Sequence, residues 1–128
     1  NIHTSQFSQD RCYVYNKAFA EAMKIGNTHD DSAFELIRVW AKERGIYDKG
    51  DDRTQYVKLM EEAGELAQAL LKNDGPEIKD AIGDMVVVLT NLSHMKGFNI
   101  EDCIQSAYDV ISKRTGKMQN GTFVKDTL

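Results

Sequence analysis

The stretch that decides the fold is YVKLMEEAGELAQALLKNDGPEIKDAIGDMVVVLTNLSHM, residues 56–95. Its first half repeats apolar residues in steps of three and one, at Tyr56, Leu59, Met60, Ala63, Leu66, Ala67, Leu70 and Leu71. That spacing predicts an amphipathic helix of about five turns. Asn73-Asp74-Gly75-Pro76 ends this helix and begins another, because proline is tolerated at a first helical position. We therefore expect two antiparallel helices around this turn.

The second half, from about Pro76 to Lys96, contains the apolar run Met85–Leu89, which by composition alone could be a buried strand. A helix is preferred because apolar residues keep helical spacing over twice the length of a strand, at Ile78, Ile82, Met85, Leu89 and Leu92. A helix that is apolar nearly all round is expected to be buried on most sides. One small protomer has few layers to cover it, so the same pattern predicts oligomerisation.

Helical patterns also flank this pair. One helix is expected over about residues 8–25, one from Asp30-Asp31 to Gly45, and a fifth that begins after the cap residue Asn99. A polar loop is expected over residues 46–53, and an irregular tail over residues 115–128. Short connections at residues 73–76 and 97–99 make the third, fourth and fifth helices antiparallel neighbours. The predicted fold class is all-α, an antiparallel bundle of about five helices.

Composition narrows the function classes. The 128 residues are 41% hydrophobic and 28% charged, as expected for one globular domain, and the formal net charge is -4. A small acidic domain is a poor general nucleic-acid binder, and no apolar run is long enough to span a membrane. The first ten residues lack the apolar core of a signal peptide. The two cysteines have no zinc spacing, so reduced thiols in a cytoplasmic protein are expected rather than one long-range disulfide.

Acidic residues gather on both sides of the central turn. Glu62 and Glu65 are three positions apart and share one face of the first helix. Asp80 and Asp84, four positions apart, share one face of the second helix. Glu65 and Asp84 each lie about eight residues from the turn, so at about 1.5 Å of rise per residue they reach similar heights. The four carboxylates can therefore converge on one groove.

Such a cluster is unfavourable alone, because like charges repel and some carboxylates would take up protons. A divalent cation removes this penalty, and oxygen ligands favour Mg²⁺, Mn²⁺ or Ca²⁺ over Zn²⁺. Gly64 and Gly83 adjoin acidic positions and leave room for close helix contact or for a ligand. The alternative is an acidic helix surface that is merely solvated.

This ordered set of motifs resembles the MazG-like, all-α nucleoside triphosphate pyrophosphatases. Residues 61–65, Glu-Glu-Ala-Gly-Glu, match the family's Glu-Glu-x-x-Glu motif, and Gly83-Asp84 with the following apolar run is similar to its second motif. The likeness covers about residues 33–98, and residues 113–121 are similar to phage-type members. Where the family has a second-motif Glu, this chain has Ala81, so Asp80 is the candidate to replace that ligand.

The resemblance implies cleavage of a nucleoside triphosphate between its α and β phosphates, giving a monophosphate and pyrophosphate. It implies Mg²⁺, or Mn²⁺ in its place, held by Glu62, Glu65, Asp84 and Asp80. Glu61 or Glu62 would accept a proton from water. The candidate substrate-binding residues are Trp40, Lys58, Asn91, Lys113, Arg114 and Lys117. The alternatives are a core anchor for Trp40, an interhelical hydrogen bond for Asn91 and surface charge for the cations.

The resemblance further implies a single domain over residues 1–128 with a core of about 31–114. It also implies a homodimer, or a homotetramer built from dimers, in which neighbouring chains complete the pocket. The expected location is the cytoplasm, which is the host cytoplasm if the protein is phage-encoded. Spacing says nothing about base or sugar, so a pyrophosphatase for dUTP, dCTP or a phosphoribosyl nucleotide is the alternative within the superfamily. A non-catalytic helical adaptor with a solvated acidic groove is the alternative of another class.

Overall fold

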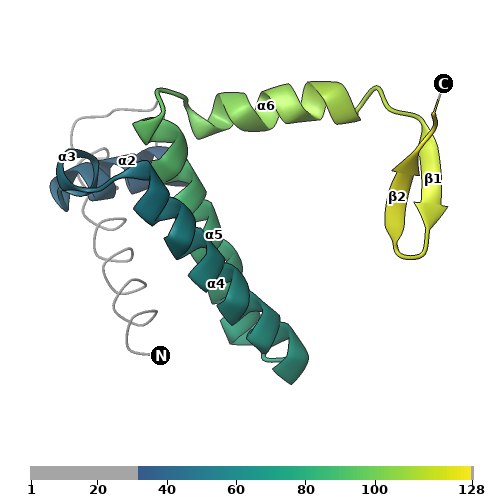
Figure 1. Cartoon of the computed structure of the whole chain (residues 1–128), viewed down its shortest axis with the longest axis horizontal. Coiled ribbons are helices and arrows are strands. Elements are labelled where there is room, and N and C mark those ends of the chain that lie inside the picture. The colour runs from purple at the N-terminus through teal and green to yellow at the C-terminus, as the bar shows by residue number, and fades with distance from the viewer. Residues whose placement is uncertain (1–31, 128) are drawn as a thin grey trace.

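The computed structural model describes residues 32–127, so the helix expected over residues 8–25 lies outside the described residues. The elements in chain order are α2 (Ala33–Glu43), α3 (Ile46–Lys49), α4 (Asp52–Lys72), α5 (Gly75–Met95), α6 (Ile100–Ile111), β1 (Gly116–Gln119) and β2 (Thr122–Lys125). Figure 1 shows that α4 and α5 form one long unit, here called the rod, with α2 and α3 at one end. From that end α6 and the two strands run away as a second unit, here called the arm. The predicted helical fold is confirmed.

The rod is antiparallel because the sequence encodes the start and stop of both helices. Asp51 caps α4 by accepting a 2.8 Å hydrogen bond from the backbone N–H of Thr54. Asp74 caps α5 in the same way, at 3.2 Å from the backbone N–H of Glu77. Asn73 ends α4 in the left-handed conformation, with φ 53°, which reverses the chain within a short turn. The helix pair predicted around residues 73–76 is confirmed.

The core lies where α2 packs against the rod. Its buried residues are Ile37, Trp40, Ala41 and Val87, and the partly buried Ile46 and Tyr47 pack against them. Ser32 caps α2, since its side chain accepts a hydrogen bond from the backbone N–H of Glu35. The helix thus begins slightly later than the Asp30-Asp31 start that the sequence indicated.

Two segments expected to be loop or irregular chain are regular, which corrects both predictions. Residues 46–49 form α3 because two apolar side chains in this otherwise polar segment pack against the core. The tail forms an antiparallel hairpin that pairs Gly116 with Lys125. Asn120 and Gly121 have φ of 51° and 83°, the two left-handed positions that a type I′ hairpin turn requires. The Asn-Gly pair at these two positions is therefore a hairpin signal in the sequence.

Two expectations of burial are not met within the single chain. One face of α5 remains at the surface, with Ile82, Val86 and Leu89 exposed by 51%, 37% and 38%. None of the twelve residues of α6 is buried, so α6 does not pack along α5 as the third member of a bundle. Both the rod and the arm therefore present apolar side chains.

Among residues 32–127 no helix is long and apolar enough to cross a bilayer.

An ion-pair network holds the first turn of the arm to α2. Arg38, 9% exposed, donates two hydrogen bonds of 2.7 Å to the two carboxylate oxygens of Glu101. It donates a third, of 2.8 Å, to Glu35 on its own helix. Two-point pairing of a guanidinium with a carboxylate is among the stronger polar contacts in proteins. The hydrogen bonds from Arg38 lower the pKa of Glu101.

We expect Arg38→Met to lower the stability of the fold by about 1–2 kcal/mol at pH 7, because the variant loses all three charge-assisted hydrogen bonds while the partly exposed Glu35 and Glu101 regain water. The folded-state pKa of Glu101 is depressed below its ordinary 4.5, so this stabilisation is present above that value and is lost as the pH falls through the folded pKa. Thermal melts of wild type and variant should differ at pH 7 and converge at low pH. An equal difference in melting temperature at pH 7 and at low pH would contradict an origin in the Arg38–Glu101 ion pair. Glu101→Gln is the matched variant, because it changes the other partner of the same pair.

Candidate active site

Two carboxylates are fully buried at the seam between α4 and α5. Glu62 on α4 and Asp84 on α5 are each 0% exposed, although charged side chains are rarely buried without compensation. Ala69 on α4 and Ala81 on α5 are buried as well. The turn predicted at residues 73–76 has therefore brought residues from both motifs into one seam.

Glu62 is electrostatically linked to two other acidic residues. Its burial, followed by the negative charges of Glu65 and Asp84, raises the pKa of Glu62 to about 7. Lys58, one turn earlier on α4, acts in the opposite sense and places its Nζ 3.8 Å from Glu62 Oε1. Glu62, Glu65 and Asp84 thus form one unit, here called the carboxylate triad.

The other two acidic candidates lie outside the carboxylate triad. Asp80 is half-buried on α5 and lines a cavity of about 690 Å³ between α2 and α5, together with Phe34 and Ile37. Glu61 is exposed on α4. Of the four carboxylates predicted to converge, Glu65 and Asp84 act electrostatically on Glu62, and the convergence of Asp80 stays a prediction.

The carboxylate triad fits a hard divalent cation in its chemistry. All its donors are oxygens, which suit Mg²⁺ or Mn²⁺, and a positive charge at the seam would offset the burial and repulsion that Glu62 experiences. Within residues 32–127, however, no three His, Cys, Asp or Glu side chains are already arranged as a metal site.

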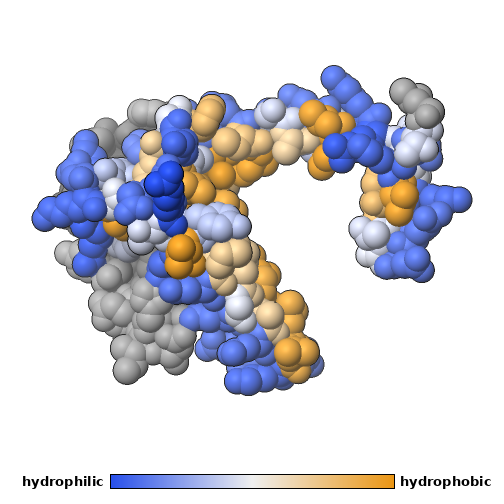
Figure 2. Space-filling view, in the orientation of Figure 1, coloured by the Kyte–Doolittle hydropathy of each residue, from blue (hydrophilic) through white to orange (hydrophobic). Residues whose placement is uncertain are grey.

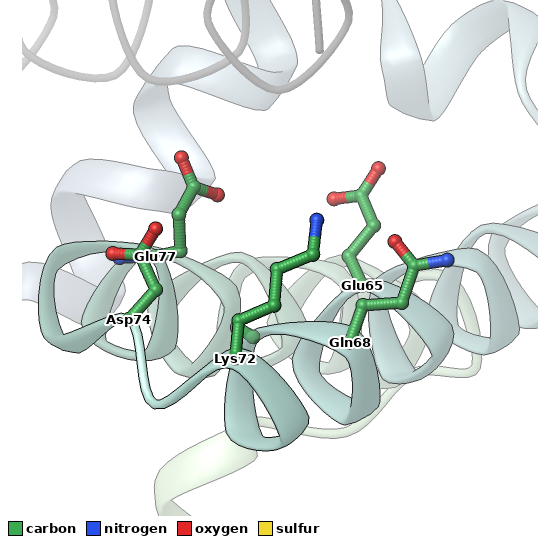
Figure 3. A pocket seen from close by; sticks show the side chains of 6 residues that line it. Glu65, Gln68, Lys72, Asp74 and Glu77 are labelled. Atoms are coloured by element: carbon green, nitrogen blue, oxygen red, sulfur yellow. The ribbon is translucent and has the colours of Figure 1, made fainter.

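A cavity of about 320 Å³ adjoins Glu65 near the turn of the rod. It is lined by Glu65, Gln68, Ala69, Lys72, Asp74 and Glu77. Figure 3 shows the carboxylates of Glu65 and Glu77 and the amine of Lys72 extending to the same side of the helix pair. Lys72 was not among the sequence candidates, although it lies seven residues after Glu65 and so on the same helix face. It adds a cation beside an acidic cavity.

Two candidate substrate-binding residues have structural partners in this chain. Trp40 is 5% exposed and belongs to the core, which favours its role as a core anchor. Asn91 accepts a 2.8 Å hydrogen bond from the hydroxyl of Tyr47. This is the interhelical hydrogen bond that was the alternative to a substrate contact. The Tyr47 ring also stacks on the exposed His94, with centroids 4.1 Å apart. Sequence spacing gave no sign of Tyr47, because it falls in the segment expected to be a loop.

The candidate cations fall into two groups. Lys58 lies beside Glu62 and is positioned with the carboxylate triad. Lys113, Arg114 and Lys117 lie beyond the far end of α6, and Figure 1 shows the arm leading away from the rod. A single chain therefore does not bring these three cations to its own carboxylate triad.

Comparison with known proteins identifies the family. The MazG nucleotide pyrophosphohydrolase domain matches residues 52–118, from the start of α4 into β1. This segment is more than half of the chain and contains the whole rod with both acidic motifs. The chain therefore belongs to the MazG nucleotide pyrophosphohydrolase family, and the resemblance noted in its motifs is confirmed.

The chain is also similar to a phage protein. An uncharacterized 18.2 kDa protein in the rep-hol intergenic region of Haemophilus phage HP1 is 42% identical over 57 residues. The aligned part covers 44% of this chain and 35% of the phage protein, so the chain spans about a third of that relative's length. No solved structure matches the chain. The family assignment thus rests on the domain match and is accompanied by a phage relative.

Proposed function

We propose that this chain is a metal-dependent nucleotide pyrophosphohydrolase that cleaves a ribo- or deoxyribonucleoside triphosphate between the α and β phosphates. The products are the nucleoside monophosphate and pyrophosphate. The observation that carries the proposal is the carboxylate triad, which lies at the seam of the rod inside the segment that matches the family domain. Family membership supports the reaction class, and the geometry of the seam supports the residues.

Each residue near the seam has a proposed role. Glu62, Glu65 and Asp84 would hold Mg²⁺ or Mn²⁺, with Asp80 as the fourth ligand in place of the family Glu at Ala81. Such a bound ion neutralises phosphate charge and lowers the pKa of water.

Glu61 or Glu62 orients the attacking water and accepts its proton. Lys58 beside the carboxylate triad, and Lys72 beside the cavity at Glu65, are placed to contact phosphate oxygens. In a homodimer or homotetramer, the arm's Lys113, Arg114 and Lys117 would contact the phosphate oxygens of a substrate bound to a neighbouring chain.

A nucleotide panel tests the proposal. Purified full chain with Mg²⁺ is incubated with the common ribo- and deoxyribonucleoside triphosphates, dUTP and a phosphoribosyl nucleotide, and the products are separated by ion exchange. Monophosphate and pyrophosphate in equal amounts are expected from at least one substrate. Release of inorganic phosphate together with a nucleoside diphosphate would contradict the cleavage position. Absence of turnover with every nucleotide would favour the non-catalytic adaptor.

Metal binding should also be visible without substrate. At ten times its dissociation constant, Mg²⁺ should stabilise the fold by about 1.4 kcal/mol, because a ligand that binds the folded state shifts the unfolding equilibrium. A thermal melt should show this as an increase of a few degrees in the midpoint. Asp84→Asn is the matched control and should lose the increase. An equal increase in that variant, or with NaCl at the same ionic strength, would contradict a specific site.

A further inference from the structure

The cavity between α2 and α5 has an apolar wall beside the core. Its volume is about 690 Å³, and its lining includes the half-buried Phe34 together with Ile37 and Val87 of the core. Val86 on the same wall is 37% exposed, although it is large and apolar. Gly83 in the middle of α5 contributes no side chain to the lining, which leaves room for a large side chain from another segment. Residues 32–127 therefore leave an apolar cavity open.

The chain enters the described structure at the edge of this cavity. Ser32 caps α2, and the next two residues, Ala33 and Phe34, line the cavity. Residues 26–31 can span at most about 21 Å, so a segment that ends at residue 25 stays tethered close to the cavity. Figure 2 shows other apolar residues along the edge of the rod and on the arm. The cavity differs from those surfaces because a segment of this chain is attached beside it.

Residues 8–25, which lie outside the described residues, have the sequence of an amphipathic helix. At about 100° per residue, apolar side chains gather on one face: Tyr15, Phe19, Ala22 and Met23. Charged side chains gather on the opposite face: Asp10, Lys17, Glu21 and Lys24. A helix with one apolar face is stabilised in water chiefly by the packing of that face. The segment therefore needs an apolar surface to pack on, and the cavity offers one.

We propose that residues 8–25 dock as a helix on the cavity between α2 and α5, with the face of Phe19 toward the cavity and the face of Lys17 toward solvent. A helix over these residues is about 27 Å long, whereas the α5 wall of the cavity, from Pro76 to Val87, is about 18 Å long. One segment is therefore long enough to cover the whole wall. The docked segment would also lie beside Asp80, the candidate fourth ligand, because Asp80 lines the same cavity.

Thermal melting of the full chain tests the apolar contact. Phe19→Asp should lower the melting temperature by about 5 °C or more, because it places a charge against an apolar wall. Val14→Asp is the matched control, since Val14 falls beside Glu21 on the opposite face of the segment. It should lower the melting temperature by less than about 2 °C, as expected for a surface substitution. Equal effects of the two substitutions would overturn the proposal.

Cross-linking identifies the occupant of the cavity, and it keeps the proposal testable if a variant fails to fold. Wild type is co-refolded from equal amounts of ¹⁴N and ¹⁵N protein and treated with a lysine-specific cross-linker. Lys17 or Lys24 should become linked to Lys79, which lines the cavity, and each link should carry a single isotope. Missing links would overturn the proposal, and so would links of mixed isotopes, which would assign the cavity to the segment of a second copy.

The two variants separate docking from tethering. A segment that is only tethered beside the cavity would link to Lys79 equally well in both variants, which would overturn the proposal. A docked segment should give several-fold fewer links in Phe19→Asp and an unchanged yield in Val14→Asp. Neither melting nor cross-linking involves nucleotide hydrolysis, so failure of the proposed reaction would leave the docked segment standing.

Discussion

Glu65→Gln is expected to reduce pyrophosphate release at least about 100-fold, equivalent to about 2.7 kcal/mol of transition-state stabilisation. The substitution keeps the size and hydrogen-bonding capacity of the side chain but removes one of the three charges of the carboxylate triad. Glu65 is half-buried and lines the cavity beside Lys72, so it lies between the seam and the space where a phosphate would enter. Initial rates with the best substrate of the panel provide the measurement.

The fold of the Glu65 variant should be intact, because the loss of one of three neighbouring negative charges relieves repulsion. Circular dichroism and thermal melting without metal should therefore match wild type or show a slightly higher midpoint. Glu43→Gln, the same change at an exposed position on α2, is the control and should keep full activity. Undiminished pyrophosphate release by Glu65→Gln would remove the carboxylate triad from the proposed reaction.

The rod could be predicted from the sequence because its determinants are local. The apolar spacing of α4 and α5, the caps Asp51 and Asp74 and the left-handed Asn73 all act within a few residues of where they stand. Once the turn is fixed, helical geometry alone brings Glu62, Glu65 and Asp84 to one seam. The height argument also applies to Asp80, one turn before Asp84 on α5; Asp80 lines the cavity between α2 and α5, and its part in the site stays a prediction.

What the sequence did not disclose depends on contacts between distant residues. Arg38 and Glu101 are separated by 63 positions, and nothing in either segment marks them as partners. Tyr47 becomes helical because the core accepts it, and Asn91 pairs with it across 44 positions. The burial of α5 was overestimated for a related reason. Apolar pattern shows that a face needs a cover, but not whether the same chain or another supplies it.

The second large effect concerns the three cations of the arm. A triple variant should reduce activity at least about 100-fold; it combines Lys113→Ala, Arg114→Ala and Lys117→Ala. The reason is that hydrogen bonds to charged groups contribute about 1.5–3 kcal/mol each. The variants should fold normally because all three side chains are exposed. Lys125→Ala, which removes a charge elsewhere on the arm, is the control and should remain active. Full activity of the triple variant would assign these residues to surface charge.

Mixing two inactive proteins then shows which chain the arm serves. The Glu65→Gln protomer has an intact arm, and the triple variant has an intact carboxylate triad, so a mixed dimer contains one complete site only if the arm acts on its neighbour. Random co-refolding of equal amounts should restore about 25% of wild-type activity, because about half of the two-fold dimers are mixed and each has one of its two sites complete. Recovery should require co-refolding rather than simple mixing if the dimer exchanges slowly. Oligomers that form but regain no activity would show that the cations do not complete a neighbouring site.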